Sequence, residues 1–357
     1  MMATPHMKTL ESDYPWITPS IPLITSAPMR LISTAPLAIA VSRAGGIGFL
    51  GSGTDVSTLP GLLSECTTSF SSSPIPNTPP GILPIGVGFI CWGASLSDAI
   101  KVIAESQLKP AAVWLFAPER IEDLITWTTS IREATNNLTK IWIQTGTVND
   151  TTYLAQHCKP DVFVIQGSDA GGHGLNQSSS IITLLPECSD ALSQSGFAHI
   201  PLIAAGGIMD ARGAAAAIML GASGICMGTR FLASSEAELS KGYQDAVLSA
   251  SDGGVTTKRT SVYDRIRGTP GWPASYGGRG VLNDTFWDSE KGLDDEENKR
   301  LYAEASQKGD LGWGIKGMGG RMCTYAGAGV GLVREVKGAG DIVKEVSEGM
   351  RKLLKIE

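Results

Sequence analysis

The stretch that decides the fold is VFVIQGSDAGGHG, residues 162–174. Its first four residues are apolar and mostly β-branched, which predicts a short buried strand. The glycines that follow carry no Cβ atom, so a large flat ligand can lie against the backbone around His173. A buried strand that ends in such a loop predicts a ligand site at its carboxyl end.

Similar short apolar runs recur along the chain, with helix-compatible segments between them. Strands are expected at 23–26, 46–50, 83–89, 112–116, 141–145, 162–166, 202–205 and 224–227. Helices are expected at 36–43, 95–106, 118–135 and 210–220, the last with Asp210 as its N-cap. Strands and helices that alternate in this way predict an α/β fold, a closed (β/α)8 TIM barrel. A doubly wound open sheet is the alternative, but it would not usually need so many strands before the first long interruption.

The alternation breaks near Ser234. Residues 250–325 are rich in Gly, Trp and Tyr, with a charged helical run at 294–307. Helical spacing of apolar residues then returns after Asp341, which is the expected N-cap of a closing C-terminal helix. We therefore expect a barrel at 20–234, an inserted cap or substrate domain at 235–320, and a return to the barrel at 321–357.

Composition excludes several classes of partner. The net charge is −6 and the basic residues are scattered, which argues against nucleic acid or an anionic membrane surface. The 6 cysteines lie far apart without metal-ligand spacing, so we expect reduced, buried thiols and no metal site. No secretory signal is visible, and no run approaches the roughly 20 apolar residues of a membrane span. The expected location is the cytoplasm.

Two glycine-rich junctions follow the seventh and eighth expected strands. They are AGGI at 205–208 and MGTR at 227–230. In this fold the loops after those strands usually bind phosphate, through backbone N–H groups at the start of a helix. The alternative is that the glycines only relieve crowding at tight turns. Neither loop resembles the GxGxxG of a Rossmann unit or a P-loop.

Other residues at strand ends could contact a planar ring or act as an acid–base group. Ala27, Pro28 and Met29 form a rigid apolar segment after the first strand, and Gln144 offers an amide at the end of the fifth. The alternative for residues 27–29 is that they are an ordinary strand exit. The alternative for Gln144 is a buried side chain whose hydrogen bonds are all made within the protein. His173 suits a general base or a donor to an anion. The remaining histidines, His6, His157 and His199, are expected to be structural.

Taken in order, these motifs resemble the nitronate monooxygenase family, formerly called 2-nitropropane dioxygenases, and its fungal-type members in particular. The motifs are APM (27–29), AGGIG (44–48), QGSDAGGH (166–173), AGGI (205–208), GTRFL (228–232) and YAGAGVGL (325–332). The resemblance implies an FMN-dependent barrel with a cap. It implies oxidation of alkyl nitronates, and in some members of nitroalkanes, by O2 to a carbonyl compound and nitrite.

The resemblance also assigns roles to residues. His173 would be the catalytic base or an anion-binding group over the flavin. The cofactor contacts would be Ala27, Pro28, Met29, Gln144, Gly171, Gly172, Gly206, Gly207, Gly228 and Thr229. Two departures stand out: Asp169 replaces a frequent Glu, and the run at 86–89 lacks a frequent flavin-contacting Asn. The cap aromatics, which either line the pocket or pack the cap, are Tyr263, Trp272, Tyr276, Trp287, Trp313 and Tyr325.

Two alternative functions stay open at this point. One is an NAD(P)H-dependent FMN reductase of the enoyl-ACP reductase or quinone reductase type, and the other is a non-catalytic flavin-binding scaffold. FMN is expected rather than FAD, because no Rossmann unit would hold an adenosine half. The expected partners are a small nitronate or nitroalkane and O2, while the oligomeric state is open.

Overall fold

The computed structural model describes residues 4–356 except 270, 316 and 318. Eight parallel strands form one sheet in the order β1-β9-β8-β6-β5-β4-β3-β2. Their bounds are β1 Leu23–Ser26, β2 Phe49–Gly53, β3 Ile82–Ile90, β4 Lys109–Phe116, β5 Lys140–Thr145, β6 Val162–Gln166, β8 Leu202–Ala205 and β9 Gly224–Met227. A parallel bridge between Thr25 and Ile47 joins the two edges. The predicted (β/α)8 barrel is confirmed.

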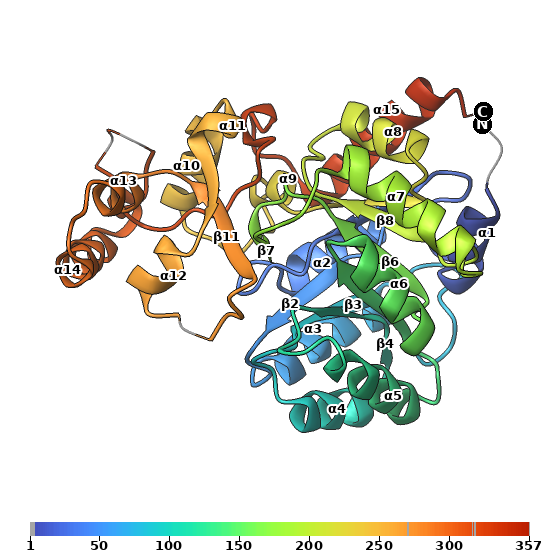
Figure 1. The fold of residues 1–357 in the computed structure, drawn as a ribbon. Helices are drawn as coiled ribbons and strands as arrows, with labels where there is room; N and C mark the ends of the chain where they lie inside the picture. Colours follow the sequence, from blue (N-terminus) through green and yellow to red (C-terminus); the bar gives the residue numbers. More distant parts are fainter. Residues whose placement is uncertain (1–3, 270, 316, 318, 357) are drawn as a thin grey trace.

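Helices surround this barrel, as Figure 1 shows. They are α1 Pro5–Asp13, α2 Ala35–Arg43, α3 Leu59–Ser72, α4 Leu96–Glu105, α5 Asp123–Thr135, α6 Val148–His157, α7 Ile181–Gln194, α8 Ala211–Met219, α9 Thr229–Leu232 and α15 Ala339–Leu354. Asp210 caps α8 as predicted, because its carboxylate accepts from the backbone N–H of Arg212 at 2.9 Å and of Gly213 at 3.3 Å.

The barrel interior is filled by aromatic rings, so it is a packed core rather than a pore. Along β5, side chains alternate between the two faces, which sends Trp142 and Gln144 to the inside. Trp142 stacks on Trp114 with ring centroids 5.9 Å apart, and Phe49 meets Trp114 edge-on at 5.1 Å. The Trp142 indole donates to the hydroxyl of buried Tyr14 at 2.7 Å, so the segment after α1 packs against this core.

Several predicted boundaries were wrong, among them the start of the fourth strand, which was expected at 112 but lies at Lys109. Strand two was expected at 46–50 but β2 begins at Phe49, because Gly48 lies so close to α2 that a Cβ there would meet Ala38 O at 2.0 Å. The helix expected at 118–135 begins only at Asp123. The last helix begins at Ala339 with Gly338 as its N-cap, so the predicted N-cap Asp341 lies inside its first turn.

The segment after β9 forms a lobe beside the barrel (Figure 1). Its elements are α10 Lys241–Ser249, α11 Gly253–Thr256, β10 Thr257–Thr260, α12 Val262–Arg267, β11 Tyr276–Val281, α13 Asp284–Glu290, α14 Asp295–Ser306 and η1 Gly309–Gly312, followed by η2 Val330–Leu332. The division of the chain at 234/235 and 320/321 into barrel and cap stays a proposal.

The glycine–histidine stretch is partly a strand, which the sequence did not predict. Gly172–Leu175 forms β7, and a second sheet runs β10-β11-β7. β7 pairs antiparallel with β11, where His173 lies opposite Gly278. The backbone that carries His173 is therefore hydrogen-bonded to the lobe.

The cysteines and helices of the described chain fit an ordinary packed interior. All six cysteines are buried and free. Burial raises the pKa of the Cys66 thiol to about 12, which keeps it protonated and unreactive. Across the described ranges, no helix is long and apolar enough to cross a membrane.

Candidate active site

The two glycine junctions lie side by side because β8 and β9 are neighbours in the sheet. Gly206 and Gly207 have φ angles of +109° and +75°, a region that L side chains rarely adopt. A Cβ on Gly228 would lie 3.4 Å from the Ala27 Cβ and 3.8 Å from the Met29 sulfur. The structure thus brings the predicted phosphate loops next to the predicted ring-contact segment after β1.

Thr229 holds a neighbouring glycine segment in place. Its hydroxyl accepts from the backbone N–H of Gly327 at 2.9 Å. A Cβ on Gly171 would lie 2.5 Å from the backbone of Ala326 and Gly327, so Gly171 packs against the same segment. Gly172 differs, because its φ is +68° and no atom of the described chain lies within 4 Å of its Cβ position. Of these two glycines, Gly172 is the one with open space beside it.

The residues at 86–89 have a packing role in this chain. A Cβ on Gly88 would lie 2.2 Å from the Pro28 ring, so the absence of a side chain lets Pro28 rest on β3. Gly86 faces the ring of Phe49 in the same way, at 2.2 Å. The absence of a side chain at Gly88 therefore makes room for the 27–29 segment against the barrel.

Gln144 carries a buried donor that has no partner among the residues that the structure describes. Its Oε1 accepts from the Trp114 indole N–H at 2.9 Å, while Nε2 is buried and unpaired. Leaving a buried donor unpaired costs about 1–3 kcal/mol, which favours a ligand that can accept from it. Gln144 is thus an incomplete hydrogen-bonding group in the protein alone.

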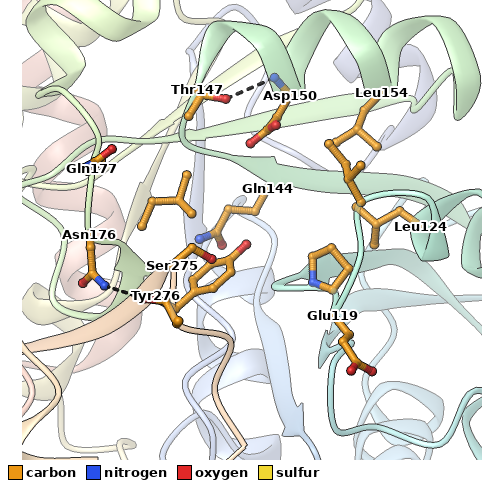
Figure 2. Close-up of a pocket in the computed structure, with 14 residues that line it drawn as sticks. Glu119, Leu124, Gln144, Thr147, Asp150, Leu154, Asn176, Gln177, Ser275 and Tyr276 are labelled. Carbon is orange, nitrogen blue, oxygen red and sulfur yellow. Dashed lines mark hydrogen bonds between the residues drawn. The ribbon is translucent and has the colours of Figure 1, made fainter.

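Gln144 also lines a cavity of about 550 Å³ beside the ends of β4, β5 and β7. Figure 2 shows Gln144 projecting toward Ser275 and toward Tyr276, the first residue of β11. Of the lining residues, the charged ones are Glu119 and Asp150. The cavity therefore has an acidic rim.

His173 is held by a carboxylate from the lobe. Its Nε2 lies 2.9 Å from Oδ2 and 3.0 Å from Oδ1 of Asp264, a residue of α12. Both side chains are nearly buried, with 11% and 12% of their surface exposed. The imidazole stacks on the indole of Trp272, with centroids 3.7 Å apart and planes 2° from parallel, and Tyr325 meets it edge-on at 5.2 Å.

Two partly buried arginines hold the backbone of the glycine–histidine stretch. Arg259 donates to the carbonyls of Ala170 at 2.8 Å and Gly172 at 2.9 Å. Arg279 donates from Nε to the carbonyl of Ser168 at 3.1 Å. Burial and the neighbouring Arg279 charge lower the pKa of Arg259 to about 10, so it is charged at neutral pH. This end of the barrel therefore carries positive charge beside the histidine.

The cap aromatics divide into two groups. Trp272, Tyr276 and Tyr325 surround the histidine, because Trp272 and Tyr325 contact His173 and Tyr276 lies 6.1 Å from Trp272. The others pack the lobe itself. Tyr263 and Trp287 belong to its apolar cluster with Phe286, and Trp313 packs on Tyr243 at 4.9 Å.

Sequence analysis missed Asp264, Arg259 and Arg279. Asp264 lies 91 residues from His173 along the chain, and no motif surrounds it. The arginines lie on β10 and β11, inside the part of the chain where periodicity gave least information. β10 has the sequence TKRT and β11 the sequence YGGRGV, so no apolar strand pattern marked either arginine.

The fold and the site define the chain as a TIM barrel with glycine loops and a held histidine at one end. The family model for nitronate monooxygenase matches residues 124–269. A nitronate monooxygenase of Metarhizium robertsii, npaC, is 46% identical over 351 residues, covering 97% of this chain and 95% of that protein. One from Neurospora crassa is 35% identical over 363 residues, covering 97% and 93%. The chain belongs to the nitronate monooxygenase family, and is an oxidoreductase whose family membership implies a flavin cofactor.

Solved structures agree on the fold. FabK from Thermotoga maritima superposes with a TM-score of 0.70 at 23% identity, covering 97% of this chain and 96% of FabK. Nitroalkane oxidase from Streptomyces ansochromogenes gives a TM-score of 0.69 at 21% identity, covering 97% and 99%. At these identities the likeness supports the barrel and the arrangement of its elements alone.

Proposed function

We propose that the protein binds FMN at the carboxyl end of the barrel and oxidises alkyl nitronates with O2 to a carbonyl compound and nitrite. The observation that carries the cofactor assignment is the unpaired, buried Nε2 of Gln144. A flavin ring offers carbonyl and nitrogen acceptors for such a donor. Family membership carries the reaction.

The residues present fit FMN. Gly206, Gly207, Gly228 and Thr229 would bind the phosphate, since their junctions lie side by side and lead into helices. Ala27, Pro28, Met29, Gly172 and Gln144 would face the ring, and Gly171 would support it by packing the loop. FMN fits better than FAD because neither junction is a Rossmann fingerprint.

The side chains of the lobe have separate tasks in this proposal. Bound FMN supplies the redox chemistry, by taking electrons from the substrate and passing them to O2. Arg259 and Arg279 make the potential around His173 positive, which favours an anionic nitronate. Trp272, Tyr276 and Tyr325 exclude water from the substrate. Residues 235–320 would then act as the cap that covers the barrel mouth and selects the substrate.

Anaerobic mixing tests the function. The purified protein, loaded with FMN, is mixed with propyl-2-nitronate and separately with NADPH while flavin absorbance is recorded. Rapid bleaching by the nitronate and none by NADPH is expected. Bleaching by NADPH alone would establish the reductase alternative, and a flavin that neither donor reduces would establish the scaffold alternative.

A further inference from the structure

We infer that Asp264 is a positioning residue that makes Nδ1 of His173 the base for neutral nitroalkanes. The inference rests on the proposed function and goes beyond it, because it names the nitrogen that meets the substrate and the residue that selects it. The observation behind it is that a carboxylate from the lobe engages Nε2 with both oxygens.

The carboxylate fixes the tautomer of the imidazole. A carboxylate oxygen can only accept from Nε2, so the ring nitrogen facing Asp264 carries the proton. Nδ1 is then the nitrogen with a free lone pair. Within the described ranges, no residue hydrogen-bonds Nδ1. The ring therefore offers one acceptor, on the side away from Asp264.

The carboxylate is itself fixed by two further donors. The Tyr325 hydroxyl and the Thr269 hydroxyl each donate to Oδ1 of Asp264 at 3.2 Å. Burial raises the pKa of Tyr325, so its hydroxyl keeps the proton that it donates. Trp272 stacks flat on the imidazole and opposes its rotation. Asp264, Tyr325 and Trp272 thus hold one orientation of the ring.

The proton step follows from this geometry. Nδ1 takes the α-proton of a nitroalkane, and the electron pair of the broken C–H bond moves onto the nitro group, giving the nitronate. The imidazolium keeps its Nε2–H bond to Asp264, whose carboxylate stabilises the new charge without taking the proton. Nδ1 then releases the proton to water. A substrate supplied as the nitronate needs none of these transfers.

Asp264→Asn is the central test. The Asn amide can donate to Nε2, which favours the tautomer with the proton on Nδ1 and removes the acceptor. We expect kcat/KM for a neutral nitroalkane to fall by about 10²–10⁴-fold, the usual contribution of a general base. For the matching nitronate, which needs no proton transfer, we expect a much smaller fall in kcat/KM. Asp264→Glu should restore part of the nitroalkane activity.

A matched control makes the same chemical change elsewhere in the lobe. Asp295→Asn removes a surface carboxylate that pairs with Arg265. Exposed pairs of this kind contribute about 0–1 kcal/mol, so both substrates should react at wild-type rates. If the control loses nitroalkane activity as Asp264→Asn does, general disturbance of the lobe explains the result and the inference fails.

A spectroscopic readout is independent of activity. The chain has 4 histidines, so ¹⁵N-histidine labelling gives few ring signals, and His173→Asn identifies the one of interest. Wild-type protein should show His173 protonated at Nε2, and Asp264→Asn should move the proton to Nδ1. Protonation at Nδ1 in the wild type overturns the inference, as does equal loss on nitroalkane and nitronate or a wild type that is inert to nitroalkanes. A wild type that oxidises no nitronate overturns the proposed function, while the ring signal still decides the role of Asp264.

Discussion

The barrel and the lobe contribute different chemistry to one site. The barrel contributes backbone: the glycine junctions after β8 and β9 and the 27–29 segment present main-chain groups and small side chains. The lobe contributes charge: Asp264, Arg259 and Arg279 all come from residues after β9. Under the proposed function, cofactor binding depends on the barrel and substrate chemistry on the lobe, so variants of the two regions should fail in different ways.

Among the variants other than those of Asp264, Gly207→Val should give the largest effect, and this effect should be confined to cofactor binding. The φ of +75° strains any other residue, and a Cβ would lie 3.2 Å from the Cβ of Asp169. With about 3 kcal/mol of strain and blocked approach, we expect FMN to bind about 100-fold more weakly, measured by quenching of flavin fluorescence. Gly61→Ala is the control, because its Cβ position has nothing within 4 Å. Unchanged FMN affinity in Gly207→Val would remove the assigned phosphate site.

Arg259→Met tests the lobe, where we expect substrate binding to change and FMN binding to stay nearly the same. It removes a charge and the donors to Ala170 and Gly172, so we expect about a tenfold higher KM for the nitronate with FMN affinity nearly unchanged. Unfolding free energy should fall by about 2 kcal/mol, since buried carbonyls lose their partners. Urea unfolding and steady-state kinetics measure the two. Lost FMN affinity would break the division between barrel and lobe.

The pH dependence of that KM is a further test. The pKa of Arg259 is lowered to about 10, so its charge is present below that pH and is lost as pH rises through it. Nitronate KM should therefore rise above pH 10 in the wild type and stay flat in Arg259→Met. The effect on the free energy of unfolding has the opposite sign: the protein becomes more stable as Arg259 loses its charge. A cation with a lowered pKa is destabilising while charged, and that cost is relieved as pH rises through 10.

Gln144→Leu should weaken FMN binding by about fivefold to tenfold, the value of about one hydrogen bond. Stability without FMN should change by less than about 1 kcal/mol, because the unpaired Nε2 is removed while the Trp114 indole loses its acceptor. Titration calorimetry and thermal unfolding of the apoprotein give both values. A tighter FMN complex in Gln144→Leu would show that the amide does not face the ring.

The smallest expected effect concerns the acidic rim of the cavity in Figure 2. Replacing Glu119 with Gln and Asp150 with Asn removes the carboxylates that repel an anion. We expect kcat/KM for the nitronate to rise about twofold to threefold at low salt and the gain to vanish at high salt. A salt-independent change would mean that the rim acts through shape.

Much of the barrel was predictable because its strands are short and buried on both faces. β1, β6, β8 and β9 have the bounds that the apolar runs predicted. The glycine junctions were likewise found from sequence, because a positive φ or a close approach of another backbone requires glycine, and a run of glycines is easily recognised. β7 escaped notice because Gly172–Leu175 has no strand pattern, and only pairing with β11 makes it one.

The sequence by itself determined the alternation of strands and helices, the glycine junctions, the family and the histidine. These depend on local periodicity and on residue types with one strong conformational preference. The tertiary structure alone decided that Asp264 meets His173, that Arg259 and Arg279 hold the loop, and that Trp272 and Tyr325 face the site while Tyr263 packs the lobe. Such contacts join residues far apart in the chain, and an Asp or Arg at a given position reads the same in sequence whether it faces water or a buried partner.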